Sequence, residues 1–91
     1  MTKTASKHMQ RVKELPCSVC GAYGPSDAHH ILAGRIPGRK SPDFLVIPLC
    51  KDCHQGSHNG IHGNQAMWKV MKKTEQECLA DTIEKLFYDY A

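Results

Sequence analysis

Two Cys-x-x-Cys pairs constrain the fold of this chain more than any other feature: Cys17 with Cys20, and Cys50 with Cys53. Each short turn directs two sulfurs toward one point, so the two turns together supply the four ligands of a tetrahedral Zn²⁺ site. A zinc ion with four protein ligands has no open coordination position, and it therefore serves structure. Buried thiols or a redox pair are the alternatives. The 29 residues between the pairs exceed the usual spacing of about 15–20 residues, so we expect this insert to form a hairpin.

Size and charge set the class of protein. With 91 residues, we expect a single domain over residues 1–91. A chain this short buries only about 60% of its unfolded surface, so a bound metal would add stability that a small core lacks. Twelve Lys and Arg residues against nine Asp and Glu residues give a net charge of +3. This mildly basic balance is compatible with a nucleic-acid partner but does not require one.

The cysteines also bear on the compartment. The chain has no apolar run of 18 residues, so we expect no membrane span, and its first residues lack the apolar segment of a signal peptide. We therefore expect a cytoplasmic protein, in which paired cysteines act as metal ligands more often than as disulfides. Cys78, the fifth cysteine, lies in a helical pattern and is expected to be a small core residue.

Periodicity and turn signals predict helices mixed with short strands, which is a small α+β fold. We expect residues 1–5 to be frayed, and Asn64 and a Thr74-x-x-Glu77 capping box to begin the last two helices. The expected elements are a helix over residues 6–15, strands over 28–32 and 44–47, a helix over 64–71 and a final helix over 74–90. We expect Pro16 to end the first helix and Pro48 to end the second strand. The apolar stripe of the final helix consists of Leu79, Ile83, Leu86, Phe87 and Tyr90.

Histidines are in surplus, because a zinc site made of four cysteines needs none of them. His29 and His30 are adjacent, so on a strand they point to opposite faces. Taken alone, this pair is most simply one core histidine and one surface histidine. His54, however, directly follows a zinc ligand, and glycines allow a close approach of the backbone around His62. An ion held by neutral imidazoles keeps positions open for phosphate and water, and His30 could take the proton of that water.

The order of these motifs resembles a known family. Cys-x-x-Cys, His-His, a strand ending in Pro-Leu-Cys, and Cys-x-x-Cys-His are the running order of the HNH (ββα-metal, or His-Me finger) endonucleases of the zinc-knuckle type. The similarity is greatest to small phage or prophage nucleases of the recombination-enhancement, RecA-dependent kind, and it covers roughly residues 12–70. The resemblance implies a ββα-metal core with a four-cysteine zinc knuckle and flanking helices, in the cytoplasm of a bacterial host cell.

The resemblance also implies a role for each histidine. His29 occupies the first position of the dipeptide and would be a ligand of a catalytic divalent ion. His30 occupies the second position and would be the general base that activates water. His54 and His62 would be further ligands of the catalytic ion, and His58 is a weaker candidate. The implied ion is Mg²⁺, Mn²⁺, Ni²⁺ or Zn²⁺, in addition to the structural Zn²⁺.

One position departs from the family pattern. Leu45 stands where the pattern has a central Asn, a residue that orients the base or holds the loop in place. Asp43, Asn59 or a backbone carbonyl could take over this role. Without a replacement, the chain would be a non-catalytic DNA-binding module with a zinc-stabilised fold.

The function implied by the resemblance is that of a hydrolase, a metal-dependent endonuclease that nicks or cuts both strands of DNA. The loop after His30 is rich in glycine, proline and cations, and we expect it to contact DNA phosphates. Its basic residues are Arg35, Arg39 and Lys40. A larger phage or host recombination or packaging protein is a further possible partner. A zinc finger that binds proteins through its final helix is the third hypothesis, and the histidine surplus favours the nuclease over both other hypotheses.

Overall fold

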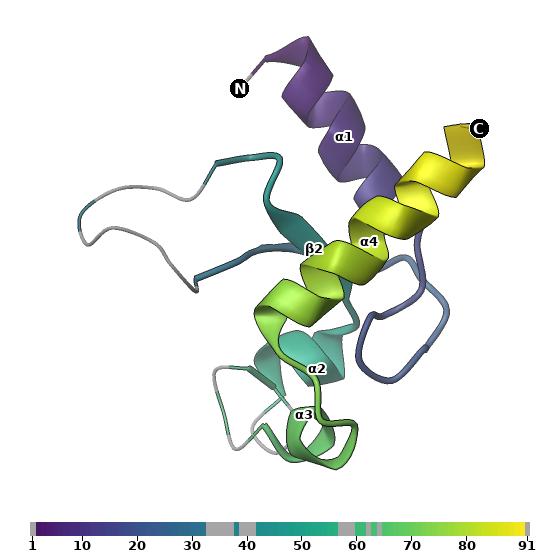
Figure 1. Ribbon diagram of the computed structural model, residues 1–91. Helices are drawn as coiled ribbons and strands as arrows, with labels where there is room; N and C mark the ends of the chain where they lie inside the picture. The colour runs from purple at the N-terminus through teal and green to yellow at the C-terminus, as the bar shows by residue number, and fades with distance from the viewer. Residues whose placement is uncertain are drawn as a thin grey trace.

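The computed structural model describes residues 2–32, 38, 42–56, 60–61, 63 and 65–90 of the 91-residue chain. Within this described part, the fold consists of a two-stranded antiparallel sheet and four helices (Figure 1). In chain order the elements are α1 (Lys3–Lys13), β1 (Asp27–His30), β2 (Val46–Leu49), α2 (Lys51–Gln55), α3 (Ala66–Val70) and α4 (Glu75–Tyr90). The prediction of a small α+β fold is confirmed.

Helix α1 begins at Lys3, three residues before the expected start at residue 6. Thr2 explains the early start, because its Oγ1 accepts a hydrogen bond of 3.0 Å from the backbone N–H of Ala5 and so caps the first turn. Residues 3–5, which we expected to be frayed, therefore belong to the helix. The buried residues of α1 are Ala5 and Val12, which face the rest of the fold.

The two strands pair with Asp27 opposite Leu49 and His30 opposite Val46. The prediction that Pro48 ends the second strand is wrong, because β2 continues through it to Leu49. The backbone N–H of Ile31 donates to the carbonyl of Leu45, and ladder bonds fall on alternate pairs of an antiparallel ladder. The pair of Pro48 with Ala28 is therefore one that shares no ladder bond. Pro48 has no N–H to donate, but a residue at this ladder position needs none. Its carbonyl accepts the N–H of Ser18 in the first cysteine turn.

The two faces of this hairpin belong to two apolar clusters. Ile47 and Leu49 face the larger cluster, which joins the two cysteine turns to α3 and the start of α4; its buried members are Cys17, Val19, Ile31, Ile47, Leu49, Cys53, Trp68 and Cys78. Val46 faces the smaller cluster, together with Val12 of α1 and Leu86 of α4. Since residues alternate between faces, His29 points to the larger cluster and His30 to the other side, as predicted.

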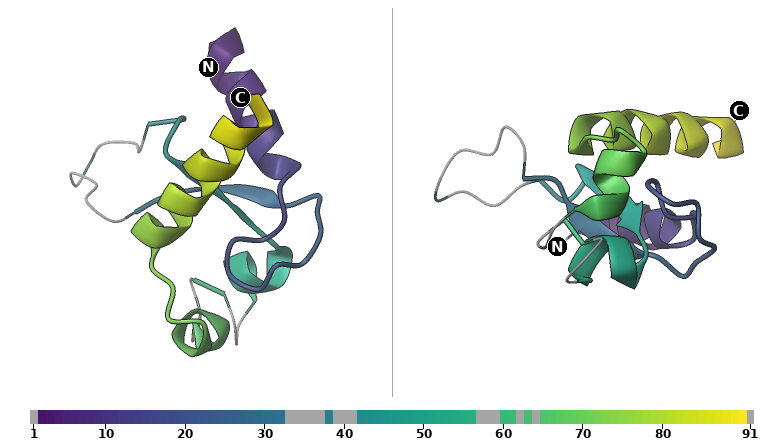
Figure 2. Two further views of the ribbon diagram at one scale, coloured as in Figure 1. Left: turned by 45° about the vertical axis from the view of Figure 1, so that its right-hand side comes forward. Right: turned by 90° about the horizontal axis from the view of Figure 1, so that it is seen from below.

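Helix α4 crosses the hairpin and contacts β2 (Figures 1 and 2). Its start is capped as predicted, because Thr74 Oγ1 accepts the backbone N–H of Glu77 at 3.1 Å. Its buried face differs from the predicted stripe. Cys78, Thr82 and Leu86 are buried, whereas Ile83 and Phe87 are 54% and 72% exposed. The buried Thr82 hydroxyl donates to the carbonyl of Cys78 at 2.7 Å, so this polar group has a partner inside the core.

The short helices α2 and α3 lie at the end of the molecule where α4 begins, while the start of α1 and the end of α4 project from the other end (Figures 1 and 2). Helix α3 begins at Ala66, and the expected N-cap at Asn64 lies outside the described residues. None of the described helices has the length and apolar content needed to cross a membrane.

Candidate functional site

The four paired cysteines meet at one point. The sulfurs of Cys17, Cys20, Cys50 and Cys53 all lie within 4.8 Å of one another, so they could hold a metal ion such as zinc. The first two come from the turn before β1, Cys50 caps α2, and Cys53 lies within α2. The prediction that the two Cys-x-x-Cys pairs converge is confirmed. We call these four residues the cysteine cluster.

Backbone hydrogen bonds set the shape of both cysteine turns. Gly21 adopts a left-handed conformation with φ +77°, and its N–H donates to the carbonyl of Cys17 at 3.0 Å. In the second turn, the N–H of Cys53 donates to the Cys50 sulfur at 3.4 Å. This hydrogen bond fixes the position of the Cys50 sulfur at the start of α2.

The thiols of Cys17 and Cys53 differ in pKa because their surroundings differ. Burial acts to raise the pKa of Cys17, but hydrogen bonds from the backbone of Cys20, Cys50 and Val19 outweigh it and lower this pKa to about 7. Burial, followed by the negative charge of Cys17, raises the pKa of Cys53. One thiolate therefore suppresses ionisation of its neighbours, and a divalent cation at their centre would remove that conflict.

His29 is one of the three buried polar residues among those the structure describes, with 5% of its surface exposed. Its Nε2 lies 2.9 Å from Oε2 of Glu75, the first residue of α4. The same carboxylate oxygen accepts the backbone N–H of Leu32 at 2.8 Å. Glu75 thus ties the start of α4 to the end of β1. No local pattern in the sequence points to this contact, because 46 residues separate the partners.

His54 of α2 lies beside His29. The two ring centroids are 5.0 Å apart, with the rings inclined at 65°. On its other side, His54 Nδ1 lies 3.1 Å from Oδ2 of Asp27, the first residue of β1. Asp27 was missed by the sequence reasoning, although its place two residues before His29 puts both on one face of the strand. The structure thus brings these two predicted site residues together.

His30 faces the other side of the hairpin and is more exposed, at 37%. Its Nε2 lies 3.0 Å from Oδ1 of Asp43. Asp43 was one of the expected substitutes for the missing Asn. Leu45 itself is half-buried and packs against the larger apolar cluster. Its side chain has no hydrogen-bonding atom, so this side chain cannot orient a base.

Several predicted site residues lie outside the described residues, namely His62, His58, Asn59, Arg35, Arg39 and Lys40. Within the described residues, the cysteine cluster is the one group of three or more possible ligands whose atoms all lie within 4.8 Å of one another. Within the same residues His29 and His54 form a pair, and the further predicted ligand, His62, lies outside them.

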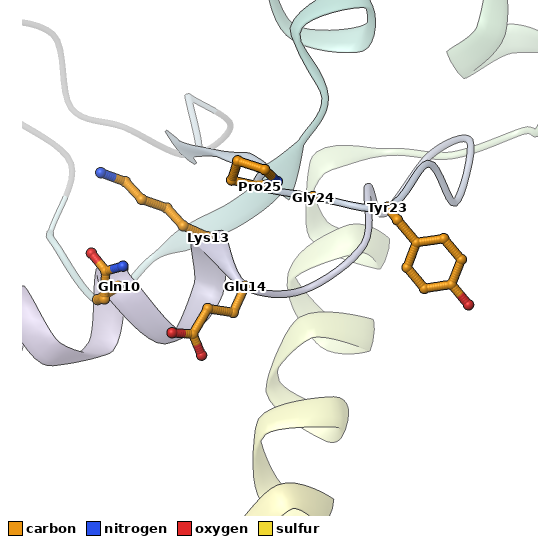
Figure 3. A pocket seen from close by; sticks show the side chains of 6 residues that line it. All are labelled: Gln10, Lys13, Glu14, Tyr23, Gly24 and Pro25. Carbon is orange, nitrogen blue, oxygen red and sulfur yellow. The ribbon is translucent and has the colours of Figure 1, made fainter.

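The surface also has shallow grooves. One of about 400 Å³ lies between the end of α1 and the loop before β1, and Gln10, Lys13, Glu14, Tyr23, Gly24 and Pro25 line it. Figure 3 shows the Tyr23 ring pointing away from the side chains of α1. None of the candidate site residues lines this groove, so it is not the place where the predicted chemistry would occur.

Comparison with known proteins gives a family but not an activity. A protein-family model for DUF968, described as a protein of unknown function, matches residues 1–87. The chain belongs to the DUF968 family. Neither a curated protein nor a solved structure matches it.

Proposed function

We propose that this DUF968 chain is a metal-dependent endonuclease of the HNH (ββα-metal) type that hydrolyses phosphodiester bonds of DNA. The observation that carries the proposal is the pairing of His29 with His54 across 5.0 Å, from a strand and a helix that the chain order β1-β2-α2 brings together. Helix α2 contacts both strands, so the three elements form one unit. A plain zinc finger has no need of this second group of histidines.

The residues fit two metal ions with different tasks. The cysteine cluster would hold a structural Zn²⁺, since four thiolates leave no open position. His29 and His54 would hold a catalytic divalent ion, and His62 is the candidate for a further ligand. The contact of His54 Nδ1 with Asp27 favours the tautomer in which Nε2 carries the lone pair, and this is the form in which a histidine ligates a metal through Nε2. When bound, that ion would polarise the phosphate and stabilise the leaving oxygen.

His30 would act as the general base. Its contact with Asp43 through Nε2 holds the N–H there and leaves the lone pair of Nδ1 to accept a proton. A water would lose that proton to Nδ1 as its oxygen attacks phosphorus, and the bond from phosphorus to the 3′ oxygen would break. The negative charge of Asp43 stabilises the imidazolium that forms. Asp43 would thus replace the Asn of the family pattern.

The second candidate function is a DNA-binding module without catalysis. Leu45 favours it, because a half-buried apolar side chain occupies the position of the orienting Asn. In that case the cysteine cluster would still hold zinc, and the histidines with their carboxylates would serve only to join α2 and α4 to β1.

Nicking of supercoiled plasmid separates the two candidates. The zinc-loaded protein is treated with a mild chelator, its remaining zinc is measured, and Mg²⁺, Mn²⁺, Ni²⁺ or Zn²⁺ is added back singly. The nuclease proposal expects nicked or linear DNA with at least one ion, and a loss of about 10²-fold or more for His30→Ala. This variant should keep its helix content, its zinc and its affinity for DNA. DNA binding without cleavage under any ion would favour the binding module, and full cleavage by His30→Ala would exclude His30 as the base.

A further inference from the structure

Helix α1 carries cations and no acid. Its positive residues are Lys3, Lys7, Arg11 and Lys13, and no Asp or Glu lies among its eleven residues. The charge of α4 is the opposite, with five acidic residues and one lysine between Glu75 and Tyr90. Positive charge is therefore concentrated on α1 and negative charge on α4, although the whole chain has a net charge of only +3.

The cations of α1 are also aligned. Lys3, Lys7 and Arg11 follow one another at four-residue steps, so they share one face of the helix. Like charges at this spacing destabilise an isolated helix by a few tenths of a kcal/mol per pair. Among the described residues, neither Lys3 nor Lys7 forms an ion pair with a carboxylate that would offset this repulsion. A polyanion would offset it.

A groove runs beside this face. It has a volume of about 420 Å³, and its lining residues are Thr4, Lys7, His8, Arg11 and Phe44. Phe44 forms its wall, since His8 Nε2 lies 3.2 Å from the Phe44 carbonyl and the two ring centroids are 5.0 Å apart. Arg11, another lining residue, is tied to α4, because its guanidinium donates to the carbonyl of Leu86 at 3.3 Å. The groove is thus held by contacts from three parts of the chain.

The groove adjoins the proposed base. Phe44 directly follows Asp43, whose carboxylate contacts His30. Helix α1 contacts both β1 and β2, so its cationic face is fixed relative to the strand that carries His30. The contact of His30 with Asp43 and the lining of the groove by Phe44 and Lys7 thus connect the proposed base to the cationic helix.

We propose that the face of α1 formed by Lys3, Lys7 and the groove beside Phe44 is a docking surface for the phosphate backbone of duplex DNA. The inference rests on the proposed DNA substrate, and it places the main contact on α1 rather than on the loop after His30. The eight helical steps from Lys3 to Arg11 span about 12 Å. That length matches roughly three to four nucleotides of one strand at about 3.4 Å each. The contact would fix position and carry no sequence preference.

The test compares two double variants of equal net charge. Lys3→Gln/Lys7→Gln removes two cations from the proposed surface, and Lys69→Gln/Lys85→Gln removes two exposed cations from α3 and α4. Glutamine has a helix propensity close to that of lysine, so both variants should keep their helix content. Binding of the full, zinc-loaded chain to a labelled duplex of about 30 base pairs is measured by fluorescence anisotropy between about 50 and 200 mM NaCl.

Each lost phosphate contact should reduce the slope of log affinity against log salt by about 0.9. The Lys3→Gln/Lys7→Gln variant should therefore lose about two units of slope and bind about tenfold or more weakly at about 100 mM NaCl, while the control pair stays close to wild type. Equal losses in both variants would mean that only net charge matters, and that result overturns the proposal. So does a wild-type protein that fails to bind the duplex.

The outcome is independent of the nuclease assay. If wild-type protein nicks plasmid but the Lys3→Gln/Lys7→Gln variant binds with an unchanged slope, the docking surface is excluded and the nuclease stands. If wild-type protein binds DNA without nicking it, and this variant alone loses affinity, the docking surface stands and the nuclease is excluded.

Discussion

The cysteine cluster and the three histidines of the hairpin and α2 are built in different ways. Each cysteine pair lies within a four-residue turn, so the chain needs to bring only two pieces together. His29, His30 and His54 each contact a carboxylate from a different part of the chain; these partners are Glu75, Asp43 and Asp27. The cysteine cluster therefore requires only that two short turns meet. The histidine contacts require that the whole fold is in place.

Both groups contain buried and exposed members, but they differ in what the buried members join. Cys17 and Cys53 belong to the larger apolar cluster, whereas Cys20 is exposed, so a metal there would lie at the edge of the core. The histidines grade from a buried His29 to a partly exposed His30. A group that stabilises a fold gains from burial, whereas a group that acts on a large substrate must reach the surface. The contrast therefore predicts that changes in the cysteine cluster affect folding, and that changes around the histidines affect activity.

The largest effect is expected from Cys17→Ser. Structural zinc contributes about 10–16 kcal/mol in zinc-finger peptides, which is as large as the whole stability of a typical small domain. We expect the variant to lose its zinc and its cooperative unfolding transition, as measured by metal analysis and thermal circular dichroism. Cys78→Ala is the matched control, since Cys78 is buried in the same apolar cluster but is not in the cysteine cluster. A Cys17→Ser variant that still unfolds cooperatively would show that the thiols act only by packing.

Asp43→Ala should have the next largest effect, on activity alone. Alanine can neither hold the Nε2–H of His30 in place nor stabilise an imidazolium by charge. We expect kcat for plasmid nicking to fall by about 10²-fold while KM and thermal stability stay close to wild type. Glu84→Gln, which removes an exposed acid on α4, is the control. If the fall is confined to KM, Asp43 does not act through the base.

Asp27→Asn should weaken the second metal site by about 10- to 100-fold, because the carboxylate that orients His54 is lost. Titration of zinc-loaded protein with Mn²⁺ or Ni²⁺ in a calorimeter measures this directly. The zinc content of the cysteine cluster should not change. A parallel loss of zinc would contradict the separation of the two groups.

The smallest effect concerns pH. Burial raises the pKa of Cys78 to about 11, from 9.0 in the unfolded chain. A raised pKa means that the stabilisation is complete below about pH 9 and is lost as the pH rises through about 11. We expect wild-type protein to lose about 1.4 kcal/mol more than Cys78→Ala between about pH 7 and pH 10. Urea unfolding at both pH values checks this, and equal losses would mean that Cys78 does not titrate as a buried thiol.

Short-range spacing was enough to predict the cysteine cluster, the α+β class and the opposite faces of His29 and His30. The second strand was predicted two residues too early, because Pro48 was expected to end it. A proline is tolerated in a strand at a ladder position that makes no hydrogen bond, and the sequence does not show which positions those are. The buried face of α4 was predicted only in part, since Leu86 is buried and Leu79 packs against the larger apolar cluster as expected. Thr82 is buried beside Cys78, whereas hydropathy alone favoured Ile83 and Phe87. The Glu75 contact could not be found from the sequence, because only the folded chain brings this carboxylate to β1.

Trp68, the single tryptophan of the chain, contacts the second turn of the cysteine cluster. Its indole N–H donates to the carbonyl of Cys53 at 3.0 Å, and its side chain is 4% exposed. Its emission should therefore report whether the second cysteine turn is closed. Filling and emptying of the cysteine cluster could be followed in real time on the native protein, without a dye and without a variant. Trp68 is thus a natural fluorescence probe for testing whether the cysteine cluster takes up a metal.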